Sequence, residues 1–171
     1  MNGLAAQPIS TERFVLRPLR VDDSTELATV LDDPALHLFI GGSPLGPDQL
    51  RERYARLVSG SPDPDEVWLN WAIQQRSDDA LVGTVQATLT GSGPHWADEV
   101  AWVVGTAWQG QGVAREAALA LVTWLTGQPV RRVVAHVHPD HRASAAVAWA
   151  AGLRPTDRMH DGEVRWELAL G

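Results

Sequence analysis

The feature that most constrains this chain is a glycine-containing junction between a strand pattern and a helix pattern. Residues 99–104 form an alternating apolar run, which predicts a strand, and residues 113–126 carry apolar side chains at helical spacing. Between them lies Gln109-Gly110-Gln111-Gly112. Glycines at such a junction let several backbone N–H groups share one concavity, and the helix dipole adds positive potential there. The sequence therefore predicts a strand–loop–helix unit suited to an anionic phosphate group.

The rest of the chain divides into short elements separated by glycine, proline and aspartate. Three consecutive strand patterns in the middle indicate an antiparallel meander, and the strand–loop–helix unit followed by another strand indicates one parallel crossover. This predicts an α+β fold with a mixed, mostly antiparallel sheet, in one domain over residues 1–171 with a flexible N-terminus at 1–10. We expect strands at 13–17, 68–75, 81–90, 99–104, 130–137 and 163–170, and helices at 22–31, 47–58, 113–126 and 140–151.

Composition excludes several classes of function. The net charge of −7 argues against a nucleic-acid binder, which would carry a basic face, and mildly favours a cationic substrate. Without cysteine, the chain has no thiol nucleophile, cysteine zinc site or disulfide. All 14 basic residues are arginine, which suggests codon bias in a GC-rich bacterial genome. Residues 1–10 have no basic n-region and no long apolar core, so we expect no signal peptide. No apolar run reaches roughly eighteen residues, so we expect a cytoplasmic protein with no membrane partner.

Two familiar phosphate-binding loops do not fit the glycine junction. A P-loop requires lysine and then serine or threonine after its last glycine, whereas Val113 and Ala114 stand there. The dinucleotide-binding fingerprint requires a third glycine where this chain has Arg115. From the junction alone, a structural turn without a ligand therefore stays open as an interpretation.

A third pattern does fit. Gln109-x-x-Gly112-x-Ala114 matches the coenzyme-A pyrophosphate motif (Gln or Arg)-x-x-Gly-x-(Gly or Ala), so the chain resembles the GNAT superfamily of N-acetyltransferases. Further stretches resemble the branch of that superfamily that includes the ribosomal-protein N-terminal acetyltransferases. These stretches are Thr11–Leu19, Gln109–Ala117, and His141-x-x-Ser144 followed by Gly152-Leu153. The resemblance runs through nearly the whole chain in the right order and spacing.

The resemblance implies a sheet of about seven strands flanked by about four helices, with a β-α-β core that binds coenzyme A. The strands at 99–104 and 130–138 would splay apart, and acetyl-CoA would lie in the cleft, its pantetheine arm along the free strand edge. Backbone N–H groups of residues 111–115 would hold the pyrophosphate, and an N–H near Val103 or Val104 would stabilise the oxyanion. The residues implied for acetyl-CoA are Val103, Val104, Gln109, Gly110, Gln111, Gly112, Val113, Ala114, Arg115, His141 and Ser144.

Acetyl transfer to an amine also needs a base for the amine and a proton donor for the departing thiolate. Glu99 stands where many relatives carry a glutamate base, and a solvated charge at a strand end explains it equally well. Ser144 matches a serine that relatives place near the coenzyme-A sulfur; it would donate a proton or hydrogen-bond its own helix. The tyrosine acid of many relatives is Ala148 here, and an asparagine that contacts pantetheine is His141.

Residues 136–141 offer a competing interpretation, because they spell His-x-His-x-Asp-His, like the zinc signature of the metallo-β-lactamase superfamily. Such a hydrolase needs further ligands downstream, and few are available: His160, Asp157 and Asp161. In the acetyltransferase interpretation, Asp140 caps the next helix, and His136 or His138 borders the acceptor pocket as an auxiliary base. We therefore expect no metal, with a zinc hydrolase as the less favoured alternative.

The expected acceptor is a primary amine, either a protein N-terminus or a small molecule. Direct transfer in a ternary complex is expected, because no cysteine is available for a covalent intermediate. We expect the acceptor pocket in residues 36–54 and in loops around His95 and Trp96. Trp68, Trp96 and Trp108 are candidates to line it, whereas Trp71, Trp102, Trp124 and Trp149 are expected in the core. A non-catalytic coenzyme-A sensor stays open as an alternative, and the resemblance allows a homodimer.

Overall fold

The computed structural model of the chain describes residues 4–39, 41–91 and 96–171. Its strands are β1 (Ile9–Ser10), β2 (Phe14–Pro18), β3 (Glu66–Gln75), β4 (Leu81–Thr90), β5 (Trp96–Val104), β6 (Val130–Val137), β7 (Arg154–His160) and β8 (Glu163–Ala169). Its helices are α1 (Asp23–Val30), α2 (Pro47–Ser59), α3 (Val113–Thr126) and α4 (Arg142–Ala150), with short 3-10 helices η1 (Pro34–His37) and η2 (Thr106–Trp108). None of these helices is long and apolar enough to span a membrane.

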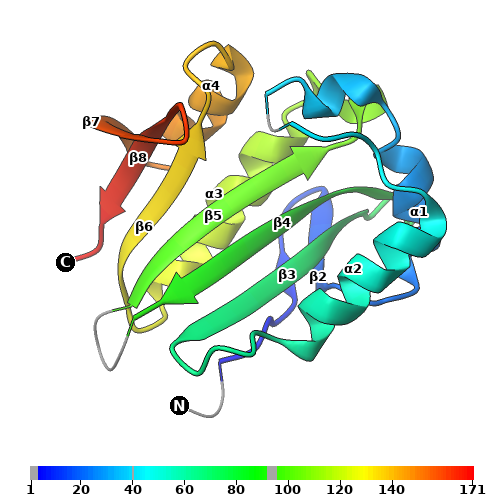
Figure 1. The fold of residues 1–171 in the computed structure, drawn as a ribbon, viewed down its shortest axis with the longest axis horizontal. Coiled ribbons are helices and arrows are strands. Elements are labelled where there is room, and N and C mark those ends of the chain that lie inside the picture. Colours follow the sequence, from blue (N-terminus) through cyan, green and yellow to red (C-terminus); the bar gives the residue numbers. More distant parts are fainter. Residues whose placement is uncertain (1–3, 40, 92–95) are drawn as a thin grey trace.

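The described strands form one sheet in the order β1-β2-β3-β4-β5-β6-β8-β7 (Figure 1). Neighbouring strands are antiparallel except β5 and β6, which are parallel and are connected in the chain through α3. The α+β fold with a mostly antiparallel mixed sheet, expected from the sequence, is therefore confirmed.

The sheet carries different helices on its two faces. On β3, Trp71 and Ile73 belong to the large core shared with α3, and the ring of Trp71 meets Trp124 of α3 edge-on at 5.5 Å. Ala72, between them, belongs to a second cluster formed with α1 and α2, because successive side chains of a strand point to opposite faces. Figure 1 accordingly shows α1 and α2 in front of the sheet and α3 behind it.

β4 and β5 approach each other closely near their shared end. A Cβ atom at Gly83 would lie 2.2 Å from the carbonyl oxygen of Val103, so only glycine fits there. Just beyond, the N–H of Gly105 donates to the carbonyl of Val82 at 2.8 Å. The end of β5 is therefore held against β4.

β5 and β6 are paired only in their first halves. The parallel pairing runs from Trp96 opposite Val130 to Glu99 opposite Val134. Beyond that point β6 stays with β8 as far as Val137, while β5 stays with β4. The two strands therefore open into a V at their C-terminal ends, which is the splay that the resemblance implied (Figure 1).

Sequence patterns did not reveal two of the strands. Ile9 and Ser10 form β1 and pair with β2, so the flexible N-terminus expected for residues 1–10 does not extend to Ser10. β7 is almost entirely exposed and contains Pro155 and charged residues, so it lacks the alternation by which a strand is recognised.

Two side-chain expectations around α4 were wrong. The helix is capped by His141, whose Nδ1 accepts the N–H of Ser144 at 3.3 Å, and not by Asp140. Trp149, expected in the core, is 55% exposed, and the guanidinium of Arg154 lies 3.6 Å from the centre of its ring. The inward side of this short helix is occupied by small alanines, so its large aromatic ring is left outside.

Candidate active site

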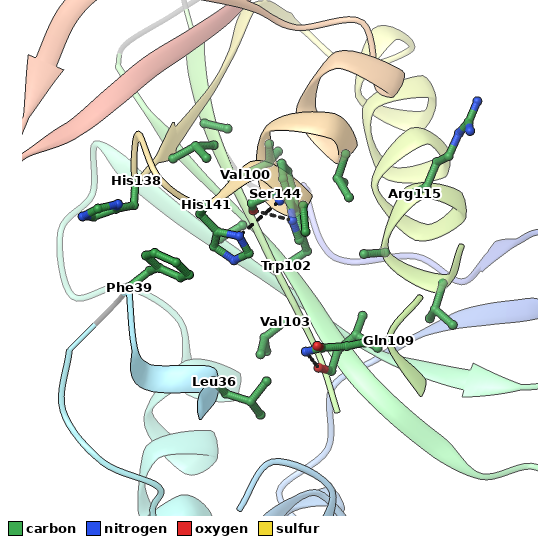
Figure 2. A pocket seen from close by; sticks show the side chains of 18 of the residues that line it. Leu36, Phe39, Val100, Trp102, Val103, Gln109, Arg115, His138, His141 and Ser144 are labelled. Atoms are coloured by element: carbon green, nitrogen blue, oxygen red, sulfur yellow. Dashed lines mark hydrogen bonds between the residues drawn. The ribbon is translucent and has the colours of Figure 1, made fainter. Parts of the chain in front are cut away.

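The V between β5 and β6 contains a cavity of about 530 Å³ (Figure 2). Its walls come from the ends of both strands, from η2, and from the first turns of α3 and α4. Most residues that the resemblance implied for acetyl-CoA lie along it: Val103, Val104, Gln109, Gly110, Gly112, Val113, Ala114, Arg115, His141 and Ser144. Gln111 is not among the lining residues, because its side-chain amide turns back to donate to the carbonyl of Ala107 at 3.3 Å.

The N-terminal end of α3 presents backbone donors to this cavity. Gly110 and Gly112 have φ angles of 73° and 79°, in the region that favours glycine. The N–H of Glu116 bonds to the carbonyl of Gly112 at 3.0 Å, whereas those of residues 113–115 have no acceptor among the described residues. With the helix dipole, these free donors form a site whose chemistry fits a pyrophosphate.

Glu116 fixes this end of α3 to the start of β2. Its carboxylate accepts hydrogen bonds from the hydroxyl of Thr11 at 2.6 Å and from the backbone N–H and Nε of Arg13, both at 2.9 Å. Burial works to raise the pKa of Glu116, but these hydrogen bonds and the charge of Arg13 outweigh it and lower the pKa. The network joins the two sequence stretches, 11–19 and 109–117, on which the family resemblance rests.

The open edge of β5 offers backbone groups at alternate residues. Because the N–H of Gly105 bonds to β4, the alternation of a strand directs the N–H of Val103 towards β4 as well, and those of Trp102 and Val104 towards the cleft. Gln109 Nε2 donates to the carbonyl of Val104 at 3.0 Å. Of the two N–H groups expected near the reacting centre, that of Val104 therefore faces the cleft and that of Val103 does not.

Ser144 and Trp102 meet across the cleft. The indole N–H of Trp102 donates to the hydroxyl oxygen of Ser144 at 3.1 Å (Figure 2). The hydroxyl thus takes its partner from β5 and not from its own helix. Its proton stays available to the cavity, because the oxygen acts here as an acceptor. Sequence reasoning placed Trp102 in the core, since nothing in a strand pattern reveals which tryptophan edge reaches a polar partner.

His141 lies at the mouth of the cavity between α4 and the loop that follows η1. Its ring stacks on Phe39 at 4.5 Å, as Figure 2 shows, and its Nδ1 accepts the N–H of Ser144. Burial, followed by the proximity of His138, lowers the pKa of His141, so the neutral ring is favoured. With Nδ1 as an acceptor, the proton of the neutral ring belongs on Nε2, which can donate to a ligand.

Glu99 and His136 form a pair at the point where β5 and β6 separate. The Nδ1 of His136 lies 2.7 Å from Oε1 of Glu99, and the side chains are 12% and 57% exposed respectively. His136 lines the cavity, whereas Glu99 is not among the lining residues. The ring of His160, on β7, lies 5.2 Å from that of His136. The pair therefore presents an imidazole backed by a carboxylate.

The His-x-His-x-Asp-His run at 136–141 does not converge on one point. His136 faces Glu99, His138 accepts the N–H of Asp140 at 3.1 Å, and His141 caps α4. Within the described residues, no group of three or more histidine, aspartate or glutamate side chains is arranged to hold a metal ion. The zinc interpretation therefore has no support from the geometry.

A second cavity, of about 320 Å³, lies between α1, α2 and strands β3 to β5. It shares Ala101, Trp102 and Val103 with the first cavity, so the two meet at the open edge of β5. From the segment 36–54, the residues along its wall are His37, Leu45, Leu50, Arg53 and Tyr54. Burial raises the pKa of Tyr54 to about 12, which keeps its hydroxyl neutral.

The other residues suggested for an acceptor pocket lie elsewhere. Trp96 is buried in the core, Trp108 lines the first cavity, and Trp68 lines neither of the two. His95 lies outside the described residues.

Comparison with known proteins identifies the family. The acetyltransferase (GNAT) domain model matches residues 13–154, so the chain belongs to this family. It is an acyltransferase, and acetyl-CoA is its acetyl donor. Among curated protein sequences, none matches this chain.

Solved structures share the fold over nearly the whole chain. The GNAT-family acetyltransferase from Bacillus anthracis has a TM-score of 0.78 and 18% identity, over 95% of this chain and 98% of that one. A ribosomal L7/L12 α-N-protein acetyltransferase in complex with coenzyme A has a TM-score of 0.76 and 17% identity, over 96% and 98%. AAC(6′)-Ib, in complex with an aminoglycoside and acetyl-CoA, has a TM-score of 0.73 and 16% identity, over 92% and 94%. At these identities the likeness establishes the fold.

Proposed function

We propose that this chain transfers an acetyl group from acetyl-CoA directly to a primary amine, with both substrates bound at once. The observation that carries the proposal is the meeting of two cavities at Ala101, Trp102 and Val103 of β5. One cavity has the chemistry of a pyrophosphate site, and the other opens under α1 and α2. A thioester and an amine that enter from the two sides would meet at one strand edge, and such positioning supplies much of the rate of a two-substrate reaction.

The residues along the first cavity fit acetyl-CoA. Backbone N–H groups of residues 113–115 would hold the pyrophosphate, and Gly110 and Gly112 would let the backbone approach it closely. The backbone groups of Trp102 would pair with the pantetheine arm, and Nε2 of His141 would donate a hydrogen bond to it. Bound acetyl-CoA supplies the activated acetyl group, and the chain supplies position, a base and hydrogen-bond donors.

We assign deprotonation of the amine to His136 and Glu99 together. A carboxylate beside Nδ1 keeps the ring proton on that nitrogen, so Nε2 of His136 is left to accept a proton from the amine. Glu99 then stabilises the positive ring. The sequence pointed to Glu99 as the base. In this proposal, His136, which reaches the cavity, accepts the proton, and Glu99 supports it.

On the other side of the reacting bond, Ser144 would serve the leaving thiolate. Its oxygen accepts from Trp102, so its own proton can be directed at sulfur. The N–H of Val104, which faces the cleft, would stabilise negative charge on the thioester oxygen. No cysteine is present, so the acetyl group is not passed through a thiol of the chain.

Calorimetric titration with acetyl-CoA tests the binding half of the proposal. Gly112→Trp, which fills the pyrophosphate turn, is expected to abolish binding. Gly60→Trp is the control, because Gly60 shares the positive φ but lies in the turn after α2 with open space around it, whereas a Cβ at Gly112 would lie 3.3 Å from Nη2 of Arg13. Equal affinity of both variants for acetyl-CoA would overturn the assignment of the loop.

Release of free thiol from acetyl-CoA in the presence of primary amines tests the chemical half. His136→Asn and Glu99→Gln are each expected to lower kcat/KM about a hundredfold and to change the acid side of its pH profile. His160→Asn is the control, because the ring of His160 lies 5.2 Å from that of His136 but His160 is outside the cavity lining. Unchanged profiles would refute the base assignment, and acetyl-CoA binding without thiol release from any amine would favour a sensor.

A further inference from the structure

The second cavity combines an apolar wall, mostly from the helices, with a few polar side chains, mostly from the sheet. Its apolar wall comes from α1, α2 and the segment before α2: Leu27, Ala28, Leu31, Leu45, Leu50 and Leu57. The polar side consists of Asn70 on β3 and Thr84 and Gln86 on β4, with Tyr54 reaching in from α2. Such a combination of apolar wall and a few convergent polar groups is typical of a small-molecule site.

These polar side chains lie next to β5, the strand at whose edge the two cavities meet. Asn70 pairs directly with Gln86 across β3 and β4, and Gln86 pairs with Ala101 across β4 and β5. Residues directly opposite each other point to the same face, so the two amides form a row that ends at the edge where the cavities meet.

These polar side chains have no hydrogen-bond partners within the described part of the chain. Among the described residues, no hydrogen bond joins the side chains of Tyr54, Asn70, Thr84 or Gln86 to another group, and none of their atoms is sealed away from solvent without a partner. A polar group covered by a ligand without a hydrogen bond costs free energy, so a good occupant must supply donors and acceptors of its own.

The cavity offers no negative charge. None of its described lining residues is aspartate or glutamate, and the one lining arginine, Arg53, forms no ion pair within the described chain. The carboxylate of Asp23, on α1, is committed to Arg17 at 2.7 Å and to the N–H of Arg20 at 2.8 Å. The carboxylates nearest the junction belong to the side of the first cavity: Glu163 lines that cavity, and Glu99 lines neither cavity but contacts His136, which does line the first.

From this arrangement we infer that the acceptor is a monoamine, an apolar body that carries a neutral amide or hydroxyl and a single ammonium group. The inference rests on the proposed function, because it treats the second cavity as the acceptor pocket. Only the reacting amine, at the junction, comes near the carboxylates of Glu99 and Glu163 on the side of the first cavity. A second ammonium would find no carboxylate along the described lining and would share the cavity with Arg53, so its burial there would be unfavourable. The net charge of −7 does not attract polycations into this cavity, because no acidic side chain lines it.

The first test compares two acceptors of opposite character. Phenylalaninamide has one amine, an apolar ring and a neutral amide, whereas spermidine is a flexible polycation. We expect kcat/KM for phenylalaninamide to exceed that for spermidine at least about tenfold, since an unpaired buried charge costs more than the corresponding 1.4 kcal/mol. Higher kcat/KM for spermidine would overturn the inference.

The second test adds the missing charge. Gln86→Glu places a carboxylate on the polar row and is expected to shift the ratio of kcat/KM values about tenfold towards spermidine. Gln7→Glu adds the same charge to the exposed N-terminal segment and is expected to leave the ratio unchanged. Gln86→Leu should lower kcat/KM for phenylalaninamide while the acetyl-CoA affinity stays the same. An unchanged ratio in Gln86→Glu would place acceptor binding outside this cavity and refute the inference.

Acetyl-CoA titration of the same preparations separates failure of this inference from failure of the proposed function. Protein that binds acetyl-CoA but acetylates polycations, or leaves phenylalaninamide unacetylated, contradicts only the monoamine inference. Protein that does not bind acetyl-CoA contradicts the proposed function itself. A Gln86 variant is interpreted only if its thermal unfolding midpoint and acetyl-CoA affinity match those of the wild type.

Discussion

Asp98 allows the effect of pH on stability to be worked out from the structure. Its side chain is fully buried on β5, and neither carboxyl oxygen has a hydrogen-bond partner among the described residues. Burial, and after it the negative charge of Glu99, raises the pKa of Asp98 from 3.8 to about 7. At about 1.4 kcal/mol for each pKa unit, this difference is worth about 4 kcal/mol.

The sign of the pH dependence of stability follows from which state, folded or unfolded, holds the proton of Asp98 more tightly. Below about pH 4 the carboxyl is protonated in both the folded and the unfolded chain, so stability is not reduced. Between about pH 4 and 7 the unfolded chain loses this proton while the folded chain keeps it, and the free energy of unfolding falls as pH rises. Above about pH 7 both states are ionised, and the loss of about 4 kcal/mol is complete.

Asp98→Asn removes this titration while keeping the shape of the side chain. Measured by urea denaturation, the free energy of unfolding of the variant relative to wild type should rise by about 4 kcal/mol between pH 4 and pH 8. Any fixed cost of the buried amide cancels in this comparison. Asp157→Asn, at an exposed position on β7, is the control and should show no such rise.

A variant whose stability differs from wild type by the same amount at both pH values would refute the reasoning, because Asp98 would then be ionised or partnered throughout. Glu99→Gln offers an independent check. Its charge is the second cause of the raised pKa of Asp98, so its removal should shift the midpoint of the stability loss to lower pH.

Three further predictions concern the cleft. Gly83→Ala places a Cβ 2.2 Å from the carbonyl oxygen of Val103, so urea denaturation should show that the free energy of unfolding falls by about 1–3 kcal/mol. Glu116→Ala removes the hydrogen bonds that fix α3 to β2, and calorimetry should show an acetyl-CoA Kd raised about tenfold; an unchanged Kd would mean that the loop is held without them. Ser144→Ala should lower kcat in the thiol-release assay about tenfold or more without changing that Kd, whereas an unchanged kcat would leave protonation of the thiolate to solvent.

Sequence patterns predicted the elements that have a strong local signal. The apolar spacing of α3, the glycines before it and the alternation of β4 and β5 are all local properties, and the structure contains these elements close to the expected bounds. β7 lacks such a signal, because an exposed edge strand buries almost nothing and has no reason to alternate. The cap of α4 was misassigned because aspartate is a preferred N-cap residue and histidine is not, and only the turn geometry brings Nδ1 of His141 to the N–H of Ser144.

The partners within the site could not be predicted, because they depend on strands brought together by the fold. Sequence alternation places Glu99 and Trp102 on opposite faces of β5, but it does not reveal that one meets His136 and the other Ser144. Both contacts require β6 to run parallel to β5 and then separate from it.

The alternation of side chains along β5 allows this one strand to contribute to both halves of the proposed reaction. Its odd-numbered residues, among them Glu99 and Ala101, face the side on which the second cavity lies, whereas Trp102 turns its indole towards Ser144 on the coenzyme side. The backbone edge between these two rows is free only because β6 departs after Glu99. In the proposed function, acceptor choice depends on the few side chains along one face of the sheet, and the charge of the whole chain, which favours cations, is a poor guide to what that face would bind.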